Sequence, residues 1–291
     1  MQLKHLFLSL LAAATCRAAA VGGAELCGTA PPTEEFLQAH KEAAAEEAAA
    51  AASGDVVKRD VFYVNTYVHI IAASESLSDG YVDNKTVDAQ IQVLNDNFSN
   101  SGYQFVLQNI SRLVDSQWSD IYNGQDLTQL KQSLHKGYYG DLNLYYFRSV
   151  YTDSTYRTSL TGFCPYPDKI ADWPFFYNDG CSLHFQTMPG GTFSPWNQGK
   201  ITSHEVGHWF GLIHPWGNFT SGGCYPPGDY VDDTPPQDQA VYGCDENSAS
   251  CGGNWNDPIH NYMGYNDNSC VNQFTNGQIT RMASMYKRYR T

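Results

Sequence analysis

Three histidines and one glutamate within residues 204–214 have the spacing needed to act on one metal ion. The stretch reads HEVGHWFGLIH. On a helix, His204 and His208 are four residues apart and share one face, so both imidazoles can reach a single ion. Gly211 lets the chain leave the helix, and His214 then returns as a third nitrogen ligand. This arrangement leaves the fourth tetrahedral position of a zinc ion open, as catalysis requires.

Glu205 lies beside the first histidine, where its carboxylate can contact a water on the metal without being a ligand. A structural alternative exists, because Thr202 and Glu205 fit a capping box and two histidines at this spacing can be a solvated pair. That alternative explains the residues separately but not their joint spacing. We therefore predict a zinc site with Glu205 as the general base of a hydrolysis. The remaining histidines of the region after residue 60 are interpreted as structural: His69, His135, His184 and His260.

Composition limits the class of protein. The 291 residues are 42% hydrophobic, which is enough for a buried core. The formal net charge of −13 disfavours nucleic acid and anionic membranes as partners, because both would be repelled. Residues 1–18 place Lys4 before a short apolar run and then small residues, a pattern typical of a signal peptide cut near Ala18 or Ala20. We expect a secreted, extracellular protein without a membrane partner.

Four Asn-x-Ser/Thr sequons agree with export through a eukaryotic secretory route, although such short motifs also arise by chance. The predicted glycosylation sites are Asn84, Asn97, Asn109 and Asn218.

Cysteine usage indicates an oxidising compartment and one unpaired thiol. Of eight cysteines, Cys16 leaves with the signal peptide, so an odd number remains. Six of these fall in the second half of the chain, and Cys27 stands apart from them. Its thiolate would fill the open zinc position and keep the enzyme latent. In the alternative, Cys27 forms a disulfide and another cysteine is free.

The segment after Cys27 is rich in alanine and glutamate and has strong helix propensity but low complexity. It ends at Lys58 and Arg59, a dibasic pair typical of processing sites. We predict a propeptide at 19–59 and a catalytic domain at 60–291; a flexible linker with a chance dibasic pair is the alternative.

Strands and helices alternate in the first half of that domain, which predicts an α/β layer. β-branched and aromatic residues predict strands, and apolar residues at helical spacing predict a helix over 86–99. Thr275 and Gln278 form a capping box for a final helix, and loops fill the region from 214 to 275. The expected strands are 61–71, 103–114, 141–150 and 180–188, the last near a sheet edge, with a short helix over 126–135.

The full stretch matches HExxHxxGxxH, the zinc signature of metzincin peptidases, and Met263 in NYMGY matches their Met-turn. Together with DDTPP and FTNGQITRM, these motifs resemble the pappalysin family, including ulilysin-like members and secreted fungal metalloproteases. The resemblance implies an α/β (α+β) fold with a twisted, mostly parallel sheet, covering helices, an active-site helix and an irregular, loop-rich C-terminal part. It also implies a zinc endopeptidase that acts on extracellular proteins or peptides, and we expect a monomer.

The resemblance assigns further residues. It implies that Met263 forms an apolar floor under the metal, that Tyr265 stabilises the oxyanion, and that Asp267 lines a primed-side pocket for a basic residue. CGT at 27–29 matches the family's thiol switch. The implied disulfides are Cys224–Cys251 and Cys244–Cys270, which leaves Cys164 and Cys181 as the third pair.

A calcium site is implied at GDYVDDT, with Asp229, Val231 and Thr234 as ligands. A solvated acidic turn is the alternative. Two other function classes were weighed, a zinc-dependent binding module with a vestigial site and a hydrolase of non-peptide bonds. The presence of Glu205 argues against the first, and no motif favours the second.

Overall fold

The computed structural model describes most of the chain outside the N-terminal segment. The expected signal peptide and the Lys58–Arg59 processing site lie outside the described residues. Those residues are 24–53, 61–169, 175–217, 224, 228–253 and 255–291.

The fold is built on one eight-stranded sheet, in the order β3-β2-β5-β8-β7-β6-β4, with β1 paired to β7. Most neighbours are parallel, while β7 runs antiparallel to both β6 and β8. The mostly parallel α/β sheet predicted from the sequence is thus confirmed. The strands are β1 (Ala24–Cys27), β2 (Phe62–Ala72), β3 (Tyr103–Val114), β4 (Asp120–Tyr122), β5 (Leu142–Phe147), β6 (Ser149–Tyr151), β7 (Ser159–Phe163) and β8 (Cys181–His184).

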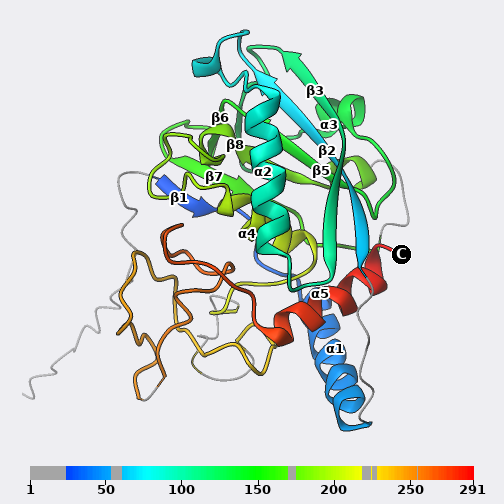
Figure 1. The fold of residues 1–291 in the computed structure, drawn as a ribbon, viewed down its shortest axis with the longest axis vertical. Coiled ribbons are helices and arrows are strands. Elements are labelled where there is room, and N and C mark those ends of the chain that lie inside the picture. Colours follow the sequence, from blue (N-terminus) through cyan, green and yellow to red (C-terminus); the bar gives the residue numbers. More distant parts are fainter. Residues whose placement is uncertain (1–23, 54–60, 170–174, 218–223, 225–227, 254) are drawn as a thin grey trace, which may run out of the picture.

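Helices cover the sheet and form the lower part of the molecule, where long loops connect α4 to α5 (Figure 1). The helix α5 begins at the predicted capping box, in which Thr275 and Gln278 bond each other's backbone. The helices are α1 (Glu34–Ser53), α2 (Asn84–Asn97), α3 (Thr128–Leu134), α4 (Lys200–Trp209) and α5 (Asn276–Tyr289), with 3-10 turns at Leu77–Asp79, Phe175–Asn178 and Phe185–Thr187.

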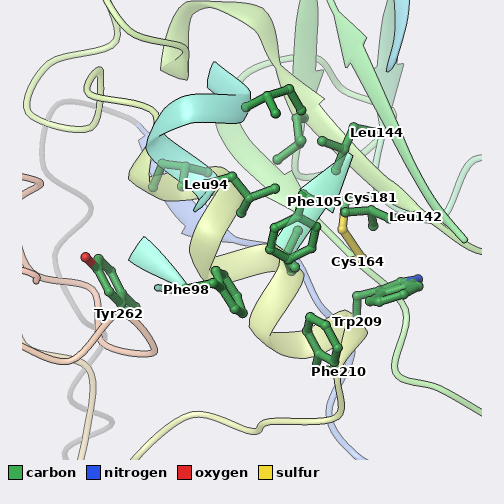
Figure 2. Close-up of a cluster of buried hydrophobic side chains, with 14 of the residues drawn as sticks. Leu94, Phe98, Phe105, Leu142, Leu144, Cys164, Cys181, Trp209, Phe210 and Tyr262 are labelled. Atoms are coloured by element: carbon green, nitrogen blue, oxygen red, sulfur yellow. A yellow bond between two sulfur atoms is a disulfide. The ribbon is translucent and has the colours of Figure 1, made fainter. Parts of the chain in front are cut away.

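The central strand β5 is buried along its whole length because both sheet faces are covered. Its alternate residues face two different cores. Leu144 and Tyr146 join the larger core under α2 and α4, and Tyr145 and Phe147 join a smaller one on the other face. Figure 2 shows part of the larger core, where Phe98, Phe105 and Phe210 gather beside the Cys164–Cys181 disulfide.

Two sequence-based expectations need correction. The segment predicted as an edge strand over 180–188 forms the short β8, which lies between β5 and β7 and is internal. Its alternation ends early because a 3-10 turn begins at Phe185. The strand expected over 141–150 is divided at Arg148, which is paired with Asp120 at the start of β4. In the described part of the chain, no helix combines the length and the apolarity needed to cross a bilayer.

Candidate active site

The helix α4 carries His204 and His208, two of the three predicted zinc ligands, together with Glu205. It begins after Gly199, whose φ of 78° places the N-cap in the left-handed region. Thr202 lies inside the helix and bonds the Tyr146 hydroxyl at 2.8 Å. The capping-box alternative for Thr202 and Glu205 therefore does not apply here. Gly211 follows the helix with a φ of 98°, which is the positive value expected for this turn.

The turn brings three imidazoles together. The Nε2 atom of His208 lies 3.2 Å from that of His204 and 3.1 Å from that of His214, and the third Nε2 pair is 3.3 Å apart. Zinc–nitrogen bonds of about 2.0–2.1 Å at tetrahedral angles separate neighbouring nitrogens by about 3.3–3.4 Å. The three nitrogens therefore have the spacing of ligands around one such ion.

Hydrogen bonds at the other ring nitrogens fix the lone pairs toward this centre. Nδ1 of His204 donates to the Tyr262 carbonyl oxygen at 2.7 Å, and Nδ1 of His208 donates to that of Leu212 at 2.8 Å. Each ring therefore keeps an unprotonated Nε2. Burial lowers the pKa of His204 to about 4, so this imidazole is neutral at neutral pH and suited to bind a cation.

Cys27 is the fourth member of the cluster. Its Sγ lies 3.5 Å from Nε2 of His208. Among the described residues, these three histidines and Cys27 are the only group of three or more potential His, Cys, Asp or Glu ligands close enough to share an ion. Strand β1 holds the thiol there because it pairs with β7, and Gly28 N donates to the Gly162 carbonyl oxygen at 2.9 Å.

Glu205 is fully buried beside this cluster, and its two carboxylate oxygens differ in surroundings. Oε2 accepts a hydrogen bond of 3.1 Å from the Thr29 hydroxyl and lies 3.7 Å from the Cys27 sulfur. Oε1 has no hydrogen-bond partner within the described part of the chain. Burial raises the pKa of Glu205 to about 8, although the hydrogen bonds from Cys27 and Thr29 act in the opposite direction.

Met263 lies directly under α4. A Cβ atom placed on Gly207 would be 2.3 Å from the Met263 sulfur, so the helix and the thioether are in close contact there. Met263 is fully buried, and the preceding residue Tyr262 supplies the carbonyl that orients His204. The turn predicted from NYMGY thus both supports the helix and orients a predicted metal ligand.

Aromatic rings enclose the histidines. Tyr265 lies edge-on to His214 at 5.1 Å, and its hydroxyl donates to the Cys27 carbonyl oxygen at 3.3 Å. Trp216 stacks on His214 at 4.5 Å. Tyr166 lies edge-on to His208 at 5.4 Å, and it was missed by the sequence analysis. It belongs to an irregular loop after β7, where no periodicity marks a residue as part of a site.

The structure places the other predicted residues as follows. The three disulfides are Cys164–Cys181, Cys224–Cys251 and Cys244–Cys270, and Cys27 is the free cysteine. Asp267 is half-buried in the turn after Met263, where its carbonyl accepts from the Cys270 amide at 2.9 Å.

Asp229, Val231 and Thr234 share one tight turn. The Val231 amide donates to Asp229 Oδ1 at 3.0 Å, and Gln278 at the start of α5 donates to Oδ2 at 3.2 Å. Burial raises the pKa of Asp229 to about 7. The effect of burial on this carboxyl therefore exceeds that of the hydrogen bonds and of Arg281, which favour its charged form.

The sequons differ in accessibility. Asn84 and Asn109 are exposed, and Asn218 lies outside the described residues. Both polar atoms of the Asn97 side chain are engaged, because Nδ2 donates to the Ser203 hydroxyl at 2.8 Å and Oδ1 accepts from the Tyr262 hydroxyl at 2.7 Å.

Known proteins resemble this chain along its whole length. An extracellular metalloprotease of Sordaria macrospora is 41% identical to this chain, and the match covers 100% of this chain and 98% of the relative. One from Pyricularia oryzae is also 41% identical, over 98% of this chain and 96% of its own. Residues 146–287 match the peptidase family described as pregnancy-associated plasma protein-A.

Solved structures share the fold. A structure of mirolysin in complex with a small compound has a TM-score of 0.63 at 23% identity, and the match covers 78% of this chain and 92% of the mirolysin chain. A promirolysin mutant from Tannerella forsythia has a TM-score of 0.64 at 21% identity, and the match covers 90% of this chain and 94% of the promirolysin chain. Sequence relatives, family match and site geometry agree: the chain belongs to the pappalysin family of metalloendopeptidases, with a metzincin fold.

Proposed function

We propose that this chain is a secreted zinc endopeptidase, with Glu205 as its general base, made as a zymogen that Cys27 keeps latent. The observation that carries the proposal is the convergence of three Nε2 atoms within 3.1–3.3 Å beside the Glu205 carboxyl. A bound zinc ion would supply Lewis acidity toward the scissile carbonyl and lower the pKa of water toward neutrality.

Residues around the metal would transfer the proton and stabilise the developing oxyanion. Glu205 takes a proton from the attacking water at a carboxylate oxygen and delivers it to the leaving amine. The Tyr265 hydroxyl, which donates to the Cys27 carbonyl oxygen in this form, becomes free to donate to the developing oxyanion when the segment leaves.

Latency is proposed to rest on Cys27. Burial and the neighbouring Glu205 raise the pKa of the Cys27 thiol well above its ordinary value. A zinc ion at the histidines would favour the thiolate, which is the ligand form. Residues 19–59 would then be removed after Arg59, following loss of the signal peptide 1–18. A mass measurement of the secreted product tests this boundary, since fully active material with residues 27–59 intact would contradict latency.

Two finer assignments are also proposed. Asp267 would favour a basic residue after the scissile bond, and a cleavage-site profile without Lys or Arg enrichment there would contradict it. Calcium would be held by the Asp229 side chain, the Val231 carbonyl and Thr234; a buried carboxyl with a raised pKa and oxygen donors on one turn supports this site. Unchanged thermal stability on calcium titration after chelation would contradict it.

The proposed activity is tested by digestion of a denatured protein with the mature form, beside Glu205→Gln, with zinc content measured on both. We expect both proteins to bind zinc and only the unmodified one to cleave. If neither cleaves while zinc is bound and residues 27–59 are gone, the peptidase mechanism proposed here is wrong.

A further inference from the structure

Helix α1 attaches the N-terminal segment to a surface outside the active site. In Figure 1, α1 lies against α5 below the sheet, away from β1. The helix buries Phe36, Leu37, Ala39 and Ala43, and these contact Ile213 and Met285 of the domain. This second attachment differs from the metal-directed contact of Cys27, which is made by β1.

The attachment has an aromatic part close to the metal site. Phe36 stacks on Tyr166, with ring centroids 4.7 Å apart and an interplanar angle of 28°. Tyr166 in turn contacts the ring of His208. A single aromatic ring therefore separates the surface under α1 from a predicted metal ligand.

The attachment also has a charged part. Glu47 accepts two hydrogen bonds of 3.0 Å from Arg281, whose side chain is only 1% exposed. Glu42 pairs with Arg288, which lies about two turns beyond Arg281 on α5. Planar, two-pronged pairs of this kind are strong when they are desolvated, and they favour a carboxylate over other groups.

The two attachments lie on the same side of the proposed processing site. β1 and α1 both precede residue 54, so a cut after Arg59 breaks no contact of either element. The cut removes only the covalent tether, and two linked attachments bind much more tightly than either alone.

We propose that the surface formed by Tyr166, Ile213, Arg281, Met285, Arg288 and Tyr289 is a binding site for the excised segment 24–53 acting in trans. The excised segment combines strand β1 with the acidic, alanine-rich helix α1, and it remains on the cut protein as a dissociable inhibitor. Activation then requires its release or destruction in addition to the cut. This inference rests on the proposed processing at Arg59.

The test uses the full chain with Cys27→Ser and Glu205→Gln, cut in vitro after Arg59. The first change removes the thiol contact, and the second prevents digestion of the segment. Co-elution on gel filtration during serial dilution gives the dissociation constant. We expect the segment to co-elute, and we expect Glu47→Ala or Phe36→Ala to weaken binding about tenfold each.

Glu46→Ala is the matched control, because Glu46 is exposed and the change removes the same charge. It should alter binding by less than about twofold, as exposed charges contribute little. All of these changes to alanine favour the helix, so weaker binding cannot come from lost helicity. Immediate loss of the segment on cutting, or equal effects of Glu46→Ala and Glu47→Ala, would overturn the proposal.

Co-elution does not depend on catalysis, so the two proposals can fail separately. If the unmodified mature protein cleaves no substrate but the segment still co-elutes, the proposed function fails and this surface stands. If cleavage occurs and the segment does not co-elute, only this inference fails.

Discussion

The Thr29 hydroxyl lies 3.1 Å from Oε2 of Glu205 and 3.0 Å from the Cys164 carbonyl oxygen. The Thr29 hydroxyl oxygen also accepts a hydrogen bond of 3.1 Å from the Cys164 amide. Thr29, two positions after the free thiol, therefore hydrogen-bonds the carboxyl group that is proposed as the general base. The N-terminal segment contacts both parts of the proposed catalytic arrangement, the histidine cluster through Cys27 and Glu205 through Thr29.

Thr29→Val should weaken latency while leaving Cys27 in place. The change keeps the shape of the side chain but removes the hydroxyl's hydrogen bonds to Glu205 and to the Cys164 backbone, each worth about 1 kcal/mol, more when the partner is charged. The uncut protein should show about five- to tenfold higher basal peptidase activity than the unmodified zymogen. Mass measurement must confirm that each sample is uncut. Basal activity equal to that of the unmodified zymogen would contradict a role for this hydroxyl.

Gly207→Ala should destabilise the protein although alanine is the better helix former. The new Cβ would meet the Met263 sulfur at 2.3 Å, and Met263 is fully buried. Overpacking costs about 1–3 kcal/mol, against a helix-propensity gain of about 1 kcal/mol. Denaturant unfolding of Gly207→Ala, Met263→Ala and the double variant measures the coupling. If the changes in unfolding free energy of the two single variants simply add in the double variant, contact between the new Cβ and Met263 does not cause the loss of stability.

The sequence predicted the parts of the site that depend on local spacing. His204 and His208 share a helix face through their separation alone, and the long strands β2 and β3 were found from their composition. The short strands β1, β4 and β7 were missed, because three to five residues carry too little periodicity. The internal place of β8 depends on pairing with β5 and β7, which no local pattern encodes.

Buried charge pairs were equally beyond local reasoning. Arg290 and Asp179 are 111 residues apart, yet they form two hydrogen bonds of 2.9 and 3.0 Å. Nothing in either segment predicts this contact, because it arises only when α5 meets the end of α4. The Asp179 carboxylate also accepts from Trp209 Nε1 at 3.0 Å, and Arg290 Nε donates to the Trp209 carbonyl oxygen at 2.9 Å.

Asp179→Asn should therefore destabilise the protein strongly. The Arg290 side chain is fully buried, so loss of its partner leaves an uncompensated charge. Such losses cost about 3–5 kcal/mol. Denaturant midpoints of this variant and of Asp88→Asn, an exposed position on α2, provide the comparison. If both variants showed a similarly small change in denaturant midpoint, the buried Arg290–Asp179 pair would not be required for stability.

Glycosylation should be uneven among the sequons. Asn84 and Asn109 are exposed, whereas Asn97 bonds both Ser203 on α4 and Tyr262 beside the Met-turn. A sugar on Asn97 would have to replace these contacts, so we expect glycans at Asn84 and Asn109 and an unmodified Asn97. Peptide mapping after deglycosylation in heavy-oxygen water measures occupancy at each site. Full occupancy at Asn97 in active protein would contradict this prediction.

His69 should make the protein less stable in acid. The Asn143 side chain donates to the Lys136 carbonyl oxygen and so turns its own Oδ1 toward His69 Nε2, at 2.9 Å. His69 Nε2 must therefore donate, and Nδ1 accepts from the Ser111 hydroxyl at 2.6 Å. Burial lowers the pKa of His69 to about 4, below its ordinary value of 6.5.

Between these two pKa values the unfolded chain binds a proton that the folded protein does not, so stability falls as the pH decreases from 6.5 to 4. Above pH 6.5 both states are neutral and the contribution is constant. At pH 5 the loss is about 2 kcal/mol relative to pH 8. Free energies of unfolding should therefore depend less steeply on pH in His69→Leu than in the unmodified protein, whatever the variant's absolute stability. If the unfolding free energy depended equally on pH in both proteins, groups other than His69 would cause the acid sensitivity. His184 would then be tested next, because burial also lowers its pKa to about 4.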